Sequence, residues 1–113
     1  MMRLMVLLAG LLAAPAWAAE TGTARWYGAR HHGHPTASGE RFDRHAMTAA
    51  HRNLPMGSRV RVTNLANNQS VVVRVNDRCR CPNTLIDLSE GAARSIGMVS
   101  GGGGTARVRL DRL

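Results

Sequence analysis

The chain contains no lysine: all fifteen of its basic residues are arginines, against only seven acidic residues. Arginine keeps its charge at any physiological pH and binds carboxylate or phosphate through two parallel hydrogen bonds. A basic surface of this kind fits nucleic acid, an anionic membrane or an acidic polymer. A genome-wide preference for arginine codons would give the same composition, so charge alone leaves the partner open.

The sequence also lacks an apolar run long enough to span a bilayer, which needs about 20 residues. Its apolar run at 4–14 follows one early arginine and precedes Pro15 and the letters AWA. This is the layout of a secretory signal peptide, and we expect residues 1–18 to be removed, with cleavage after Ala18 or Ala19. An amphipathic or buried helix is the alternative. No cysteine follows the apolar run directly, so a lipid anchor is not indicated.

Aromatic residues make up 4% of the sequence, and neither an internal repeat nor an interdomain linker is visible. The remaining chain of roughly 95 residues is enough for one small domain, which we expect at 22–113. With few aromatic rings to stack on bases, and with an export sequence, nucleic acid is disfavoured as a partner. We expect a monomer with no stable membrane insertion after the signal peptide is removed.

Only two cysteines are present, and a single residue separates Cys79 from Cys81. Export favours a disulfide. A bridge across one residue, however, closes a small, strained ring and removes little chain entropy, so free or intermolecular thiols are the alternative. A metal site that combines these cysteines with His31, His32 and His34 is disfavoured, because the spacing matches no standard zinc pattern. We therefore expect no metal and no cofactor.

Short alternating segments between turn residues predict a mainly β protein. Strands are expected at 21–28, 59–65, 70–77, 84–89 and 105–110, and the piece at 46–51 is a strand or a turn. In 59–65 the alternation turns Val60 and Val62 inward, and Arg59, Arg61 and Thr63 outward. The segment 89–97 predicts one helix, with Ser89 as its N-cap and Gly97 past its end. Closing the strands into a small barrel would remove their exposed edges.

An acid ends the most apolar of these strands, VVVRVND. By alternation Asp77 continues the face of Val73 and Val75, whereas Arg74 and Asn76 point the other way. Apolar surroundings raise the pKa of a carboxyl group, and a raised pKa suits a general acid. The alternative is an aspartate that caps the turn after the strand through its side chain.

Four segments follow one another along the chain: WYG, TASGERFD, AMTAAHRNLPMGSRVRVTNLANNQSVVVRVNDR and LIDLS...AARSIGM. In this order they resemble the RlpA-like (rare lipoprotein A) family, from about Ala24 to Leu110. The resemblance implies a small six-stranded double-psi β-barrel with one short helix. It also implies an endolytic peptidoglycan lytic transglycosylase, located in the periplasm or outside the cell and associated with the cell wall. Expansins share the fold, so a non-catalytic wall-binding or wall-loosening module is the alternative.

The resemblance also assigns roles to residues. The catalytic aspartate of the family falls on Asp77, and Glu40 and His51 match a glutamate and a histidine that family members need for activity. These two would bind sugar hydroxyls, or tune and orient Asp77. The alternatives are a solvated loop glutamate and a structural histidine bonded to the backbone. Asp87 falls where expansin-like relatives keep a functional acid, and we assign it to substrate binding. Many relatives follow NDR with GPF, whereas this chain has CRCPN, which changes the loop beside Asp77.

The implied reaction cleaves the β-1,4 bond between MurNAc and GlcNAc in glycan strands without water. Asp77 would protonate the glycosidic oxygen and then take the proton of the MurNAc 6-hydroxyl, which closes a 1,6-anhydro ring. One acid/base can suffice because the substrate supplies the nucleophile, whereas hydrolysis normally uses a carboxylate pair. Alternation turns either Trp26 or Tyr27 outward, and we assign Tyr27 to sugar binding.

Overall fold

The computed structural model describes residues 18–99 and 104–113. The predicted signal peptide, apart from Ala18, lies outside the described residues. Within them, no helix combines the length and the apolar character needed to cross a bilayer. The described part of the chain forms six strands, β1 Glu20–Tyr27, β2 Thr48–Ala50, β3 Arg59–Asn64, β4 Ser70–Asp77, β5 Ile86–Ser89 and β6 Thr105–Arg112. It also has a short 3-10 helix, η1 Ala29–His31, and one α-helix, α2 Glu90–Ser95.

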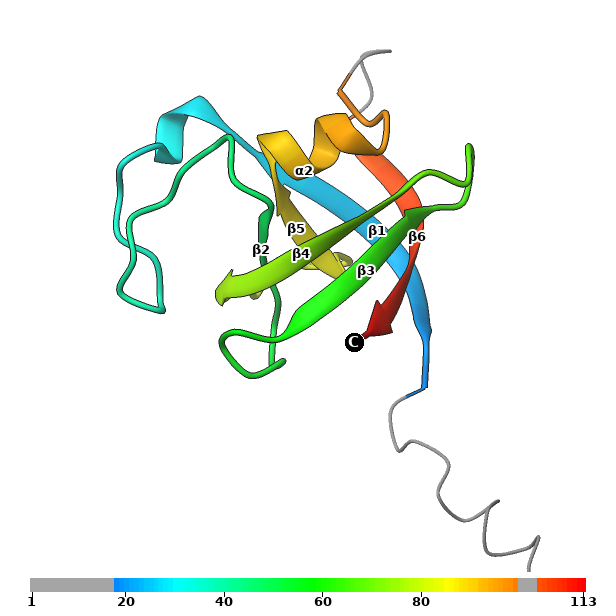
Figure 1. Cartoon of the computed structure of the whole chain (residues 1–113), viewed down its shortest axis with the longest axis horizontal. Coiled ribbons are helices and arrows are strands. Elements are labelled where there is room, and N and C mark those ends of the chain that lie inside the picture. Colours follow the sequence, from blue (N-terminus) through cyan, green and yellow to red (C-terminus); the bar gives the residue numbers. More distant parts are fainter. Residues whose placement is uncertain (1–17, 100–103) are drawn as a thin grey trace, which may run out of the picture.

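The strands close into a barrel in the order β1-β5-β2-β4-β3-β6, which confirms the predicted fold class. The pairs β1/β5 and β2/β4 are parallel, and the other four pairs are antiparallel. Helix α2 lies over one end of the barrel, where it contacts β1, β4 and β5 (Figure 1). Because closure pairs both edges of every strand, so small a sheet presents no open edge.

The alternating valines of β3 and β4 fill the barrel. Val60, Val62, Val73 and Val75 are fully buried and pack with apolar side chains of β5 and β6. Burying one such side chain stabilises the fold by about 1.5–3 kcal/mol. The inward prediction for Val60 and Val62 is confirmed, but the outward prediction for Thr63 is wrong, since its side chain is buried.

The reason lies in what covers this end of β3. The next residue, Asn64, donates a hydrogen bond of 2.7 Å from Nδ2 to the carbonyl oxygen of Ile96. The segment that follows α2 therefore lies against the end of β3 and keeps it from solvent. Strand alternation cannot predict the burial of Thr63, because the pattern depends only on residues that are neighbours in sequence.

A β-bulge interrupts β4 just before its last residue. Ala49 pairs with Val75 but Ala50 pairs with Asp77, so two residues of β4 lie opposite one residue of β2. The outward prediction for Asn76 is consequently wrong: this extra residue is buried. Bulges often lie beside functional sites because they redirect a side chain. Here Val75 pairs with Ala49 and Asp77 pairs with the next residue, Ala50, so the two lie on opposite faces. The prediction that Asp77 continues the face of Val73 and Val75 is therefore wrong.

The predicted helix forms with its predicted ends. The Ser89 hydroxyl oxygen accepts a hydrogen bond of 3.1 Å from the backbone N–H of Ala92, which is an N-cap. Gly97, with φ of +76°, ends the helix in the left-handed region. Since Ser89 is also the last residue of β5, the helix is fixed directly to the strand that carries Asp87.

Candidate active site

A cavity of about 270 Å³ opens beside the ends of β1, β2, β4 and β5. Five of the residues predicted for the site or for the disulfide line this one cavity. Its lining consists of Tyr27, His31, Ala50, Asp77, Arg78, Cys79, Arg80, Cys81 and Asp87. A larger hollow of about 400 Å³ elsewhere has no aspartate or glutamate in its lining, which consists of Pro55, Met56, Gly57, Ser58, Arg59, Arg112 and Leu113. The smaller cavity is therefore the candidate active site.

Sheet register explains how two distant acids reach the same cavity. Ala50 of β2 pairs with Asp77 of β4 on one side and with Asp87 of β5 on the other. Two strand spacings separate the backbones of the two acids by roughly 10 Å. Between them in the sheet lies Ala50, whose small side chain is also part of the cavity lining.

The Asp77 carboxylate is held from two directions. Its Oδ1 accepts a hydrogen bond of 2.9 Å from the backbone N–H of Ala37 and one of 2.8 Å from the N–H of Arg78. The first donor comes from the loop between η1 and β2, and the second from the residue after the strand. The prediction that apolar surroundings raise the pKa of Asp77 stays a prediction.

Asp87 is the carboxyl group that burial perturbs. Desolvation raises the pKa of Asp87 from 3.8 to about 6, with a smaller opposing effect of Arg25 and a further raising effect of the Asp77 charge. Its Oδ1 is buried and has no hydrogen-bond partner among the described residues. Burial disfavours the charged form of a carboxyl group, so Asp87 keeps its proton at pH values where an exposed aspartate has lost it.

The Tyr27 ring contacts two other rings, so the feature that this residue can offer the cavity is its hydroxyl group rather than an open ring face. Its ring stacks on Phe42 at 4.6 Å between centroids, and His31 contacts it edge-on at 5.3 Å. The hydroxyl is buried, and in the part of the chain that the structure describes it has no hydrogen-bond partner. Desolvation first, and then the charges of Asp77 and Asp87, raise the pKa of Tyr27 far above its usual value of 10. Tyr27 therefore stays neutral and offers the cavity a hydrogen-bond donor.

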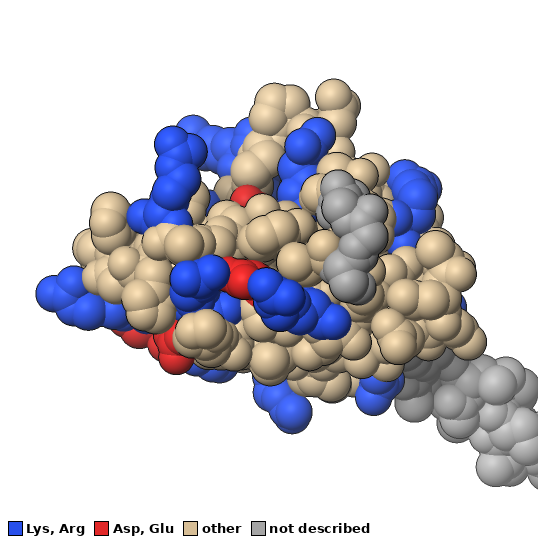
Figure 2. Space-filling model, turned by 90° about the horizontal axis from the view of Figure 1, so that it is seen from above, with Lys and Arg blue, Asp and Glu red and all other residues tan. Residues whose placement is uncertain are grey.

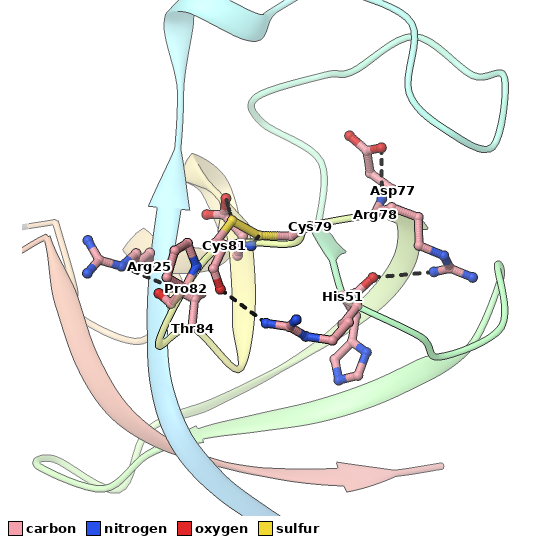
Figure 3. The surroundings of a disulfide bond; sticks show 10 residues. Arg25, His51, Asp77, Arg78, Cys79, Cys81, Pro82 and Thr84 are labelled. Carbon is pink, nitrogen blue, oxygen red and sulfur yellow. Dashed lines mark hydrogen bonds between the residues drawn. A yellow bond between two sulfur atoms is a disulfide. The ribbon is translucent and has the colours of Figure 1, made fainter.

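A disulfide joins Cys79 and Cys81 (Figure 3). Both cysteines line the cavity. The Cα atoms lie 5.3 Å apart, and Arg52 Nη2 donates a hydrogen bond of 3.2 Å to the Cys81 carbonyl oxygen. Cys81 Sγ lies 3.9 Å from Asp87 Oδ2. In the disulfide this sulfur carries no proton, so it contacts the carboxyl group without donating a hydrogen bond to it.

Cys79, Cys81 and Asp87 are also the group that could hold a metal ion, since their ligand atoms lie within 4.8 Å of one another. Metal binding needs thiolates, and in the disulfide the two sulfurs are not available as thiolates. Within the described residues no histidine joins this group. The structure therefore does not assemble the ligand set considered from the sequence.

His51 lies behind the cavity rather than on its wall. Its Nδ1 accepts hydrogen bonds from the backbone N–H groups of Asn53 and Leu54, at 3.2 and 3.1 Å. Its own backbone N–H donates to the Asp77 carbonyl oxygen at 3.1 Å, and its carbonyl accepts from Arg78 Nη1 (Figure 3). Burial lowers the pKa of the imidazole. The neutral ring thus fixes the turn after β2, and the backbone of His51 fixes the end of β4.

Glu40 is also outside the cavity lining. Its carboxylate forms a bidentate ion pair with Arg74 on β4, with contacts of 2.5 and 3.1 Å. The hydrogen bond from Arg74 is the main cause that lowers the pKa of Glu40. Gly39, with φ of +95°, makes the tight turn just before Glu40, and the same loop supplies the N–H of Ala37 to Asp77. The ion pair thus fastens to β4 the loop that orients Asp77.

We predict that Glu40→Gln lowers kcat about tenfold and leaves KM nearly unchanged, because the Ala37 N–H then orients Asp77 less well. Arg74→Gln should cause the same loss, and the double variant no further loss. The free energy of unfolding should change by less than about 1 kcal/mol, because both side chains of the pair are largely exposed. Asp111→Asn breaks a similarly exposed ion pair with Arg109 and serves as the control with unchanged kcat.

Sequence reasoning did not predict four residues of the cavity lining: His31, Ala50, Arg78 and Arg80. The sequence drew attention to His31 only as a metal ligand, whereas it contacts Tyr27 at the cavity wall. Ala50 gave no signal by itself, since its importance is its small size between two acids. Arg78 belongs to the NDR motif that begins at Asn76, and Arg80 belongs to the departure CRCPN, which was the signal that could have identified it.

Comparison with known proteins agrees with this geometry. The family model described as lytic transglycolase matches residues 19–110. The chain belongs to this family. The sequence resemblance implied a six-stranded double-psi β-barrel. The closed six-stranded barrel and the family match confirm this fold.

Curated relatives carry the family's activity in their names. The chain is 62% identical over 93 residues to a probable endolytic peptidoglycan transglycosylase RlpA of Synechocystis, which covers 80% of this chain and 28% of that protein. It is 50% identical over 95 residues to the endolytic peptidoglycan transglycosylase RlpA of Neisseria meningitidis, covering 83% of this chain and 39% of the relative. The chain thus spans well under half the length of these relatives.

Solved structures share the barrel at lower identity. A Streptomyces papain inhibitor superposes with a TM-score of 0.68 at 23% identity, covering 88% of this chain and 97% of that one. A point mutant of the Clavibacter michiganensis expansin, in complex with cellohexaose, gives a TM-score of 0.68 at 20% identity, covering 85% and 50%. These two proteins differ in what their titles say they bind or inhibit, so the likeness supports the fold and nothing further.

Proposed function

We propose that the protein is an endolytic peptidoglycan lytic transglycosylase that cleaves the MurNAc–GlcNAc β-1,4 bond and leaves 1,6-anhydro-MurNAc ends. The observation that carries the proposal is the pair Asp77 and Asp87 on either side of Ala50 in one cavity. The names of the relatives with 62% and 50% identity support the same reaction. The substrate is then the glycan strand of peptidoglycan.

The sequence predicts one acid/base at Asp77, and the structure adds a second carboxyl group with a different environment. We assign the first proton donation to Asp87, because burial raises its pKa to about 6. Protonating the glycosidic oxygen lets the C1–O bond break. The Asp77 carboxylate, oriented by two backbone N–H groups, accepts the proton of the MurNAc 6-hydroxyl as that oxygen attacks C1.

The proton count balances after one return step. The leaving GlcNAc oxygen has gained the proton of Asp87, and Asp77 has gained the proton of the 6-hydroxyl. Transfer of one proton from Asp77 to Asp87 across the cavity restores the starting state. The neutral Tyr27 hydroxyl belongs to a residue that lines the same cavity as both acids, and we assign it as a donor to the substrate or to the carboxylates during this cycle. We assign Glu40 and His51 as positioning residues that hold the Asp77 end of β4.

The proposed function includes an exported, wall-associated protein in the periplasm or outside the cell. It acts as a monomer, without a cofactor. The location follows from the predicted signal peptide and the peptidoglycan substrate.

Incubation of the purified protein with isolated sacculi tests the proposed function. The expected result is release of soluble muropeptides that end in 1,6-anhydro-MurNAc, identified by their mass, which is about 18 Da below that of the hydrolysed product because no water is added. Reducing MurNAc ends would show a hydrolase instead. Tight binding to sacculi with no released product would favour the expansin-like module.

A further inference from the structure

Charge in the cavity is divided between its interior and its rim. The carboxyl groups of Asp77 and Asp87 share the lining with two arginines, Arg78 and Arg80, whose side chains are exposed. Among the described residues, no ion pair joins either arginine to either acid. Arginine side chains are also spread over the face drawn in Figure 2, with acids visible in few places. The cavity thus suits a substrate that is neutral at the reacting bond and anionic beside it.

The two rim arginines differ in the number of hydrogen bonds that they form within the protein. Arg78 donates its backbone N–H to Asp77 Oδ1 and a guanidinium N–H to the His51 carbonyl oxygen at 3.4 Å. Within the described residues, the Arg80 side chain has no hydrogen bond, ion pair or ring contact. Arg80 is therefore the rim arginine whose full set of donors remains open to a ligand.

The backbone of Arg80 is nevertheless well held. It is the single residue between the bonded Cys79 and Cys81, and the Cys81 N–H lies 3.2 Å from Cys79 Sγ. Arg52 also donates a hydrogen bond to the Cys81 carbonyl oxygen, which holds the disulfide ring from its other side. A long side chain on a fixed backbone loses less freedom on binding than one on a mobile loop.

We propose that Arg80 forms an anion subsite at the rim of the cavity and binds a carboxylate of the substrate next to the cleaved bond. The guanidinium fork matches a carboxylate through two parallel hydrogen bonds. Peptidoglycan offers two sources of this chemistry. One is the free lactyl carboxylate of MurNAc without a stem peptide, and the other is a carboxylate on the stem peptide itself. This subsite rests on the proposed function for the identity of its ligand.

Binding to three uncleavable tetrasaccharides tests the subsite. Each has sulfur in place of the bridging glycosidic oxygen, and the lactyl groups are free acids, methyl amides, or amides bearing an L-Ala-D-Glu dipeptide. Calorimetry with the wild-type chain should show about tenfold tighter binding of one anionic ligand than of the methyl amide. Preference for the free acid identifies the lactyl carboxylate, and preference for the dipeptide identifies the stem peptide.

Arg80→Gln should reduce this preference to within about twofold, and Arg80→Lys, which keeps the charge without the fork, should retain part of it. Arg61→Gln removes an equal charge from the exposed face of β3, outside the cavity, and should leave the preference unchanged. A thiol assay confirms that each variant keeps its disulfide.

Three results would overturn the subsite: equal affinity of the wild-type chain for all three ligands, no binding of any of them, or a preference that survives Arg80→Gln. The measurement is independent of turnover. Carboxylate-selective binding without anhydro products from sacculi would leave the subsite standing and reject the proposed reaction. Anhydro products without carboxylate-selective binding would support the proposed reaction and reject the subsite.

Discussion

Replacing Asp77 with asparagine is expected to lower the release of 1,6-anhydro products by about 10²- to 10⁴-fold, the range that a positioned acid or base contributes. The amide oxygen of asparagine can still accept the N–H groups of Ala37 and Arg78, which hold the aspartate now. The loop and the bulge should therefore keep their structure, and only the proton acceptor is lost. The measurement is the initial rate of product release, together with thermal unfolding.

Asp43→Asn is the matched control for this variant. It removes the same charge from an exposed loop acid outside the cavity, so the rate should remain at the wild-type level. Retention of more than about a tenth of the wild-type rate by Asp77→Asn would contradict the assignment of Asp77, because a residue that moves protons contributes far more.

Replacing Asp87 with asparagine is expected to have opposite effects on activity and on stability. The rate should fall by about 10²-fold or more, since asparagine has no proton to donate to the glycosidic oxygen. Wild-type activity should itself decline as the pH rises through about 6, because Asp87 then ionises. The variant should lack that pH dependence in its residual rate.

The stability effect follows from the direction of the pKa shift. Asp87 ionises at about pH 6 in the folded state and near 3.8 when exposed, so the unfolded chain releases this proton first. The contribution of this proton to the free energy of unfolding is therefore complete below pH 3.8 and is lost as the pH rises to about 6. Asp87→Asn should unfold at a higher temperature than wild type at pH 8 and at the same temperature at pH 3. Lower stability of the variant at pH 8 would contradict the burial argument.

Local pattern was enough to predict most of the barrel. The strands at 59–65 and 70–77, the Ser89 cap and the Gly97 helix end all follow from alternation and capping chemistry, and all are present in the structure. Each depends on residues close in sequence. The bulge at Asn76 was not predictable in this way, since it arises from the pairing of β4 with β2.

The chemistry of the site depends on contacts that the sequence does not display. Asp87 lies between Ile86 and Leu88, and alternation alone turns it away from the core. The structure nevertheless half-buries it, because the disulfide loop and Tyr27 cover the same cavity. Alternation therefore does not predict that burial raises the pKa of Asp87.

Family resemblance identified Glu40 and His51 as candidates, and the structure suggests why they would matter without touching substrate. Glu40 reaches Arg74 across 34 positions in the sequence, and Asp77 reaches Ala37 across 40. Both contacts hold the same loop against β4, and that loop orients the Asp77 carboxylate. Residue types and spacing cannot show such convergence before the chain is folded.

The central claim is that Asp87 shares a cavity with the Asp77 charge and keeps its proton to an unusually high pH. A pH titration of the side-chain carboxyl carbons by ¹³C NMR, in the wild-type chain and in Asp77→Asn, tests this most directly. We predict a midpoint of about 6 for Asp87 in the wild type and a lower midpoint in the variant, where the neighbouring charge is absent. A wild-type midpoint near 3.8, unchanged by the substitution, would contradict the account.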